Sequence, residues 1–511
     1  MRKGIPIPPE PEQHDRAKKA AASVTITPSS ASLDESDTAS GSGSDAGSTR
    51  TTAGSAADRL LGNTGPASIF EIASSVSDVD ERFPEGGIRA WFIVLGCWLG
   101  LFASLGLMNI LAAFPPYIST NHPLQPSTGA VGGIIGGYTF LNLSLGIYVG
   151  PLFDKYGPRW LILAGTVCLV ASLLLVNIST SYWSLLLALG ILSSLGSSLL
   201  FTPSIAAIGH FFHDRRGLAT GVATTAGPAS AIVFPYLLRT LFVSIGFAWA
   251  VRALALACLA PAAIANFLIR SRRLPPLPPS TAKNSPPHAI NNNDDNNNNN
   301  TKPPAAAATA RPDPRIFRAR GYTRTVIAIF LSQFASFLSL AYFSAYMLGK
   351  GFANAFAFDV VAALNASSAV GRVAGGWAAD KAGAFNASVV VSAVAALACF
   401  AVWLPAGGTG PGIVVFAVLL GLASGAASCL VPVAVGRLCK TREYGRYYAT
   451  CYSVVSLAVL VAVPLAGAVV GAAGGDYWGL VVMTGLLYVA AAVAFALAKV
   501  EVVGKRMWVT F

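Results

Sequence analysis

The sequence predicts an all-α membrane protein in which twelve transmembrane helices form two six-helix halves related by a parallel repeat. Three observations predict this fold. The composition is 54% hydrophobic and only 11% charged, long apolar runs recur along the chain, and one loop motif occurs twice. An ordinary soluble domain contains about 25% charged residues, and a helix that crosses a bilayer needs about 20 mostly apolar residues. A large soluble core does not account for repeated runs of that length.

Twelve apolar runs have the length of a membrane-spanning helix. In chain order they cover residues 91–114, 129–150, 160–178, 184–208, 218–241, 248–270, 323–347, 357–379, 386–404, 412–435, 450–473 and 479–498. Runs of this length and hydropathy are typical of polytopic helical membrane proteins.

Polar segments precede, separate and follow these spans. Residues 1–84 are rich in Ser, Thr, Ala, Asp and Gly, and residues 271–322 contain Pro-rich and Asn-rich stretches. We expect a disordered cytosolic tail and a disordered cytosolic linker, respectively. The linker divides the chain into an N-terminal six-helix half, 85–270, and a C-terminal six-helix half, 323–498, which a short cytosolic tail, 499–511, follows.

Positive charge gathers on one side of the predicted spans. If both termini lie on the same side, that side receives nearly all the loop lysines and arginines, whereas the opposite loops hold little beyond Lys350. This distribution places both termini in the cytosol, and we expect a multi-pass plasma-membrane protein in contact with lipid. The formal charge of +12 is therefore an orientation signal, and we expect no nucleic-acid partner.

The motif Gly-x-x-x-Asp-Lys-x-Gly occurs after the second span and again after the eighth. Its two copies consist of Gly150, Asp154, Lys155 and Gly157, and of Gly376, Asp380, Lys381 and Gly383. Both copies have the same spacing and the same place within their halves. Two halves related by a parallel repeat are an architecture used by secondary transporters.

Both aspartates of the motif are expected at the C-terminal end of a helix, where the helix dipole disfavours an anion. We therefore expect for Asp154 and Asp380 a partner outside their own helix, either the N-terminus of a neighbouring helix or a loop arginine. Gly157 and Gly383 permit the tight turn that follows. An ordinary loop-and-cap device and a conformational latch both fit this pattern.

The repeated motif resembles the one that joins the second and third helices in the major facilitator superfamily, and the resemblance covers residues 85 to about 498. Three further segments, "EGGIRAWFIVLGCW", "RRGLATGVATTAG" and "VPLAGAVV", resemble the fungal branch of the monocarboxylate porter family. The resemblance implies the major facilitator fold and secondary transport. It also implies that the repeated motif is a latch that closes the inner face in one state and opens in another.

Arg372 lies in an apolar run, eight residues before Asp380. At 1.5 Å per residue it is about 12 Å from the cytosolic helix end, near the midplane of a hydrocarbon core about 30 Å thick. The repeat provides a comparison, because the position four residues before Gly376 is Arg372 whereas the position four before Gly150 is Gly146. The charge is not part of the duplicated scaffold, and intramembrane charges usually serve function. A guanidinium favours a carboxylate ligand; an internal salt bridge or a hydrogen-bonded structural arginine is the alternative.

Arg372 also matches the substrate-binding arginine of the animal monocarboxylate porters. Two other positions differ from that pattern: Ser368 replaces an acidic residue, and Asn109 replaces the lysine of the first span. We expect Arg372, Asn109 and Ser368 to bind substrate. The two replaced charges argue against the proton-coupled transport of small monocarboxylates. The identity of the coupling ion, a proton or another ion, stays open.

The sequence thus predicts a secondary active transporter of organic anions, either carboxylic acids or acidic secondary metabolites, that works by alternating access in a fungal plasma membrane. Efflux or uptake of a neutral or vitamin-like metabolite is an alternative, motivated by Asn109 and Ser368. An alternative from another class is a transport-inactive metabolite sensor that signals through residues 1–84. The sequence contains no motif for nucleotide binding, for a metal, or for a nucleophile and its base, so we expect neither a cofactor nor enzyme activity.

Overall fold

In the computed structural model, Arg82–Phe511 form one compact unit. The structure describes residues 85–113, 128–179, 181–270 and 311–504. The regular structure in these ranges is entirely helical. The predicted cytosolic tail, 1–84, and most of the predicted linker lie outside the described residues.

The first half contains six membrane-spanning segments, three of which are composite. Its helices are α3 (Ile88–Ala113), α5 (Thr128–Ser144), α6 (Gly146–Tyr156), α7 (Pro158–Val176), α8 (Tyr182–Leu185), the π-helix η1 (Leu186–Leu192), α9 (Ser193–Ile208), α10 (Arg216–Thr224) and α11 (Ala226–Leu268). The second span is α5 with α6, and the fourth is α8, η1 and α9. The fifth is α10 with the first part of α11 (Arg216–Leu238), and the sixth is the later part of α11 (Thr240–Leu268). Gly246, with a φ of 76°, kinks α11 within the sixth span.

The second half repeats this plan with longer unbroken helices. It contains α12 (Tyr322–Gly349), α13 (Asn354–Ala382), α14 (Ala384–Ala398), the π-helix η3 (Cys399–Trp403), α15 (Leu404–Ala406), α16 (Gly410–Gly436), the 3-10 helix η4 (Thr441–Glu443), α17 (Tyr444–Ala472) and α18 (Trp478–Val503). Together, the described residues contain twelve helices long and apolar enough to cross a membrane, which confirms the predicted number.

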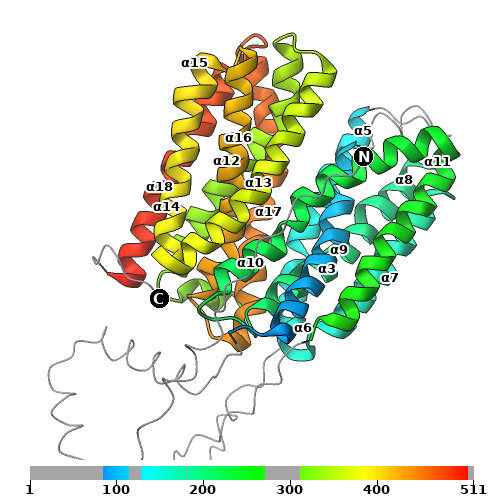
Figure 1. Cartoon of the computed structure of the whole chain (residues 1–511), viewed down its shortest axis with the longest axis vertical. Helices are drawn as coiled ribbons and strands as arrows, with labels where there is room; N and C mark the ends of the chain where they lie inside the picture. Colours follow the sequence, from blue (N-terminus) through cyan, green and yellow to red (C-terminus); the bar gives the residue numbers. More distant parts are fainter. Residues whose placement is uncertain (1–84, 114–127, 180, 271–310, 505–511) are drawn as a thin grey trace, which may run out of the picture. The chain divides into compact units, whose positions relative to one another are not determined.

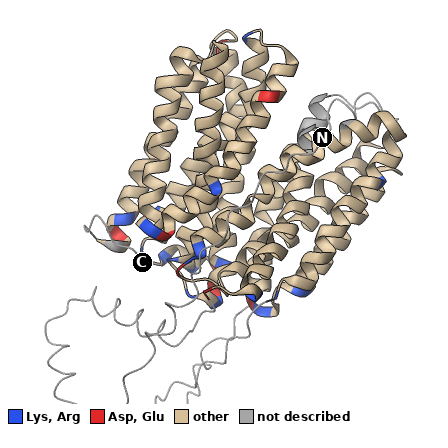
Figure 2. Ribbon diagram, viewed as in Figure 1, with Lys and Arg blue, Asp and Glu red and all other residues tan. Residues whose placement is uncertain are grey.

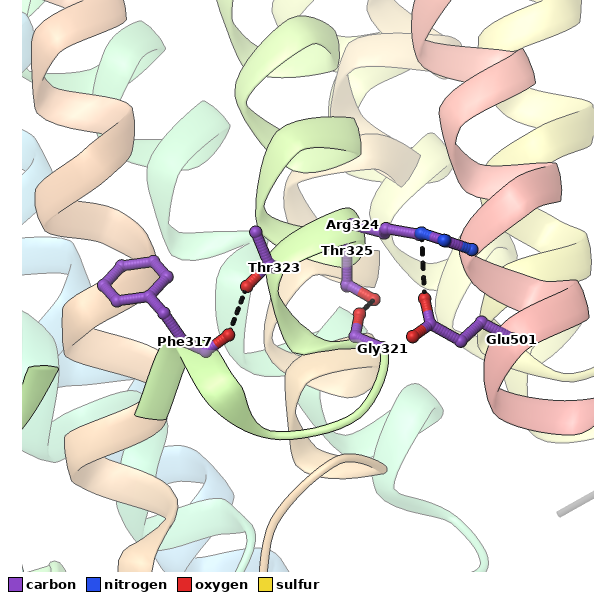
Figure 3. Close-up of polar contacts among 6 residues, drawn as sticks. All are labelled: Phe317, Gly321, Thr323, Arg324, Thr325 and Glu501. Atoms are coloured by element: carbon purple, nitrogen blue, oxygen red, sulfur yellow. Dashed lines mark hydrogen bonds and ion pairs between the residues drawn. The ribbon is translucent and has the colours of Figure 1, made fainter. Parts of the chain in front are cut away.

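The boundaries of the second half differ from the prediction at both ends. The linker predicted to be disordered over 271–322 includes an ordered 3-10 helix, η2 (Pro314–Arg318), and α18 continues to Val503 beyond the predicted end of the half at 498. Both segments contact the first turn of α12, as Figure 3 shows. Thr323 Oγ1 donates to the carbonyl of Phe317 at 2.5 Å, and Arg324 Nε lies 3.1 Å from Glu501 Oε2. Hydropathy assigns these polar segments to loops, but their side-chain contacts hold them in ordered helices.

Small residues bring α13 and α16 into close contact. A methyl group on Gly371 or Gly425 would collide with a backbone carbonyl, that of Leu422 or Ser368 respectively, so α13 and α16 approach to backbone distance. Glycine and alanine at such positions are what helix packing within a bilayer favours. Across the boundary between the halves, α10 packs on α13, and α5 and α6 pack on α17 (Figure 1).

Candidate functional site

The first motif aspartate caps a helix of the other half. Asp154, near the end of α6, accepts hydrogen bonds from the backbone N–H of Gly445 at 2.9 Å and of Arg446 at 2.8 Å. These amides belong to the first turn of α17, where N–H groups have no partner within the helix. The carboxylate therefore satisfies two orphan donors and complements the helix dipole.

The second motif aspartate also caps a helix of the other half, here from the second half to the first. Asp380, near the end of α13, accepts from the N–H of Gly217 at 2.7 Å and of Leu218 at 2.8 Å, in the first turn of α10. Gly217 and Gly445 are each the second residue of their helix, so the two caps are related by the repeat. Of the two kinds of partner expected from the sequence, both aspartates have the helix N-terminus.

The glycines of the two contacts leave no space for a side chain. A methyl group on Gly376 would collide with the carbonyl oxygen of Gly217, and one on Gly150 with the carbonyl oxygen of Gly445. In the reverse direction, a methyl group on Gly217 or Gly445 would lie 2.5 Å from Oδ1 of the capping aspartate. The first glycine of each motif thus lets the halves approach closely enough for the aspartate to reach its amides.

The remaining motif residues have local roles. Gly157 and Gly383 have φ values of 78° and 86° and join consecutive helices, a backbone conformation that favours glycine. Lys155 and Lys381 are exposed, and the Lys155 ammonium lies 5.0 Å from the ring centroid of Tyr156 in its own half. The described contacts between the halves therefore come from the glycines and aspartates of the motif, and the membership of both lysines in the latch stays a prediction.

A buried arginine that the sequence reading did not select completes this interface. Arg216, the first residue of α10, places its guanidinium 4.0 Å from the ring centroid of Tyr444 in the other half, and its Nη1 donates to the carbonyl of Gly436 at 3.4 Å. Methyl groups on Gly209 or Gly436 would overlap this head group. In the sequence, the only indication of this contact is an arginine together with these two glycines, and the two glycines lie far apart in the chain.

The acidic residue of the segment "EGGIRAW" has a structural partner. The Glu85 carboxylate accepts from the N–H groups of His213, Asp214 and Arg215, at 2.8 to 3.4 Å, directly before α10. It thereby ties the start of α3 to the start of α10. Figure 2 shows that most charged residues of the described chain gather at this same end of the helices.

Nearby charges at this end of the helices affect the pKa of a further arginine, Arg437. Burial lowers the pKa of the Arg437 guanidinium, and the nearby charge of Arg216 lowers it further, whereas Asp380 and Glu85 oppose the change. Acidic and basic side chains at this end thus have opposing effects on the pKa of this guanidinium.

Arg372, in the middle of α13, contacts the other half through a backbone carbonyl. Its Nη1 donates to the carbonyl of Thr224, the last residue of α10, at 3.0 Å. The buried Nε has no hydrogen-bond partner among the described residues, and no described carboxylate lies within ion-pair distance of the head group. The guanidinium is thus held by a neutral acceptor and keeps unused donor capacity.

A proline explains why this carbonyl is available. In a continuous helix the N–H of residue 228 would donate to the carbonyl of Thr224, but Pro228 has no N–H. The helix breaks at Thr225, α10 ends, and the free carbonyl accepts from Arg372 instead. The negative end of the α10 dipole lies at the same place and favours a cation.

Two charged residues of α13 therefore hold both ends of α10. The Asp380 anion binds the N-terminal amides, and the Arg372 cation binds the C-terminal carbonyl. Each charge has the sign that the local end of the helix dipole favours. This arrangement joins the predicted substrate-binding arginine to the predicted latch through one short helix.

The other two predicted binding residues are placed differently. Asn109 Nδ2 donates to the carbonyl of Gly227 at 3.2 Å and to Ser230 Oγ at 3.1 Å. A methyl group on Gly227 would lie 3.4 Å from Arg372 Nη2, so Asn109 and Arg372 meet at the same break. Ser368 is buried against α16 at Gly425, and no described contact joins it to the guanidinium. The structure brings two of the three residues together.

A layer of aromatic rings extends from the Arg216 contact towards Arg372. Tyr444, Tyr448 and Tyr452 follow at intervals of four residues on α17, with ring centroids 5.8 and 4.8 Å apart. Phe201 of the first half lies 5.7 Å from Tyr452, and all four rings are buried. These rings fill the space between the halves at the charged end, so the halves are in contact there.

Comparisons with known proteins agree with this architecture. The family model described as Major Facilitator Superfamily matches residues 96–450. The chain is 32% identical over 427 residues to an MFS-type transporter 1 of an Ophiocordyceps species, a match that covers 83% of this chain and 88% of the relative. It is 29% identical over 439 residues to the riboflavin transporter MCH5 of Saccharomyces cerevisiae, covering 84% and 82%.

The fold is also that of a solved transporter. A crystal structure of the transporter FucP in its outward conformation superposes with a TM-score of 0.59 at 16% identity, over 80% of this chain and 98% of that one. Twelve membrane helices, the repeated interface and these matches describe a multi-pass membrane transporter rather than an enzyme. The chain belongs to the Major Facilitator Superfamily.

Proposed function

We propose that the chain is a secondary active transporter of organic anions, carboxylic acids or acidic metabolites, and that Arg372 binds their carboxylate. The observation that carries this is the state of the guanidinium. It is a cation held by one neutral carbonyl, with a buried Nε that has no partner among the described residues. A buried charge without a counter-charge is expensive, and a bidentate carboxylate would supply both the charge and the missing acceptors.

We also propose that the two aspartate caps form the latch of alternating access. The caps, the Arg216 contact and the aromatic layer all join the halves at the charged end of the helices. Opening that end would break both caps together. On the positive-inside distribution this end faces the cytosol, which would place both termini there, in a plasma membrane. We assign the chain to the fungal branch of the monocarboxylate porter family on the segments it resembles.

The test compares acids with neutral analogues of the same shape. Purified protein is offered a panel of labelled aromatic and aliphatic carboxylates, each paired with its primary amide, and binding and counterflow in proteoliposomes are measured. Hydrogen bonds to a charged group contribute about 1.5–3 kcal/mol each. The wild type should therefore prefer at least one acid over its amide by tenfold or more, and Arg372→Gln should remove that preference.

The matched control is Arg252→Gln. Arg252 is an exposed arginine of α11 whose guanidinium lies 4.8 Å from the ring centroid of Trp249. This variant should keep the preference for acid. The proposal fails if Arg372→Gln binds the preferred acid as the wild type does, or if the wild type favours no acid over its amide.

A neutral or vitamin-like substrate is the second candidate. The similarity to the yeast riboflavin transporter favours it, and Asn109 supplies an uncharged hydrogen-bonding group beside the helix break. Labelled riboflavin is the probe: transport that survives in Arg372→Gln but falls in Asn109→Leu supports this reading. A metabolite sensor would bind its ligand without any counterflow.

A further inference from the structure

The turn between α6 and α7 carries exposed basic and aromatic side chains at the charged end of the helices (Figure 1). Lys155 and Tyr156 are the last two residues of α6, and Arg159 and Trp160 belong to the first turn of α7. All four side chains are exposed, the tyrosine by 59% and the tryptophan by 74%. These four residues, called the α6–α7 patch below, place two cations and two large rings close together on the surface.

The cations of the α6–α7 patch have no acidic partner among the described residues. The carboxylate of Asp154, the residue before Lys155, accepts from two amides of α17, and no described ion pair includes Lys155 or Arg159. The Lys155 ammonium lies 5.0 Å from the ring centroid of Tyr156, so the lysine and the tyrosine share one surface. The positive charge of the patch is therefore available to an anion.

The second copy of the motif lacks this combination of residues. With the two copies in register, two rings and one cation of the patch are replaced: Tyr156, Arg159 and Trp160 align with Ala382, Phe385 and Asn386. Phe385 is buried, and Asn386 Nδ2 donates to the carbonyl of Ala382 at 2.7 Å. The lysine alone recurs, as the exposed Lys381. Because the turn is duplicated and the patch is not, the patch serves something other than the fold of the turn.

The α6–α7 patch continues into an apolar face of α7. Trp160, Leu163 and Val167 are all exposed and follow at intervals of three and four residues, which places them on one side of the helix. The helix is long and apolar enough to cross a membrane, and exposed apolar side chains on such a helix face hydrocarbon. Tryptophan and tyrosine are enriched where the hydrocarbon meets the headgroups. We therefore expect the patch at headgroup level and the apolar face of α7 in the hydrocarbon.

We propose that the α6–α7 patch binds an anionic phospholipid, whose headgroup is held by Lys155 and Arg159 while an acyl chain covers Trp160, Leu163 and Val167. This inference goes beyond the proposed function. Charge complementarity selects the lipid class, because lysine and arginine form charge-assisted hydrogen bonds with phosphate, whereas a zwitterionic lipid offsets the attraction with its own ammonium. On the proposed orientation the patch faces the cytosolic leaflet, which contains the anionic lipids.

The test measures lipid binding to the full-length protein. Delipidated protein in a neutral detergent is titrated with phosphatidylserine, or with phosphatidylcholine of the same acyl chains, and the first bound lipid is followed by native mass spectrometry. Each cation near a headgroup contributes about fivefold to the affinity for an anionic lipid. The wild type should therefore prefer phosphatidylserine by about tenfold or more. The double variant Lys155→Gln, Arg159→Gln should lose this preference.

The matched control is the double variant Lys381→Gln, Lys440→Gln. It removes the same charge from two exposed lysines at the charged end of the second half, and it should keep the wild-type preference. In both double variants, the affinity for phosphatidylcholine shows whether the protein still binds lipid as a folded membrane protein.

A second readout needs no variant. The wild type in phosphatidylcholine nanodiscs is acetylated with an amine-reactive ester, and the modified lysines are identified by peptide mass spectrometry. Replacing part of the phosphatidylcholine by phosphatidylserine should slow the acetylation of Lys155 severalfold and leave that of Lys381 nearly unchanged. Glycerophosphoserine, which is the same headgroup without acyl chains, should not protect Lys155.

Each contrary outcome overturns the inference. It fails if the wild type does not prefer phosphatidylserine, if the Lys155→Gln, Arg159→Gln variant keeps the preference, or if the control variant loses it equally. Equal protection of Lys155 and Lys381 by phosphatidylserine contradicts a site in one half. Protection by glycerophosphoserine identifies a site for soluble phosphate esters instead of a lipid. None of these readouts depends on transport, so the proposed function stands in each case.

Discussion

Removing the charge of Asp380 should shift the balance between the two access states. Its carboxylate accepts two backbone hydrogen bonds at 2.7 and 2.8 Å, both from the other half. Asparagine keeps one acceptor oxygen but presents an NH2 group to the second amide. Hydrogen bonds to a charged group contribute about 1.5–3 kcal/mol and neutral ones about 0.5–1.5 kcal/mol. Asp380→Asn should therefore destabilise the state in which the halves meet here by about 3 kcal/mol, about 100-fold in population ratio.

The assay measures the distance between the halves at the charged end. Spin labels on Trp160→Cys and Val500→Cys, exposed residues of α7 and α18, report it by double electron–electron resonance. The seven native cysteines are buried or half-buried, so the introduced thiols react preferentially. Asp380→Asn should enrich the longer distance. Lys381→Gln, the exposed neighbour outside the contact, is the matched control. The reasoning is refuted if Asp380→Asn leaves the distribution unchanged or if Lys381→Gln shifts it equally.

Three further predictions concern the charged end of the helices. Gly376→Ala should cost the closed state about 1–3 kcal/mol by overpacking against Gly217, which slows counterflow, whereas Gly136→Ala, with open space around it, should not. Arg216→Leu should lose the cation–π contact, worth about 0.5–2 kcal/mol, and should enrich the same longer distance in the spin-label assay. Glu85→Gln should weaken the contacts to three amides and lower the melting temperature by a few degrees, measured on purified protein in detergent.

The sequence predicts the fold because the information is local and repeated. Each span is encoded by its own run of apolar residues, and the two copies of one motif relate the halves, so neither inference needs long-range contacts. Local hydropathy does not identify polar segments that become ordered through contacts with residues far away in the sequence. The first turn of α17 at Tyr444 and the 3-10 helix at Pro314–Arg318 lie outside the predicted spans for this reason.

The site is predicted less completely, since its contacts join residues far apart in the chain. The dipole argument gives the kind of partner that Asp154 and Asp380 need, but not which helix supplies it. The predicted depth of Arg372 in the membrane indicates a functional residue, but it does not reveal the hydrogen-bond acceptor. That acceptor is available because of Pro228, about 140 residues earlier in the sequence, whose missing N–H leaves one carbonyl free. The resemblance to the animal monocarboxylate porters predicts Ser368 as a binding residue, because it replaces an acidic residue of that pattern. Packing against α16 buries that residue, and helix spacing alone does not reveal it.

The double attachment of α10 suggests how substrate and latch communicate. Asp380 at the N-terminus and Arg372 at the C-terminus attach this short helix to α13 at both of its ends. On the proposed function, a substrate carboxylate that also engages Nη1 would replace the Thr224 carbonyl, because the charged acceptor forms the stronger hydrogen bond. Binding would then release one end of α10 and leave the aspartate cap as the remaining attachment to α13. A ligand shifts an equilibrium only by its difference in affinity between two states. In the proposed cycle of alternating access, this exchange of acceptors would supply such a difference.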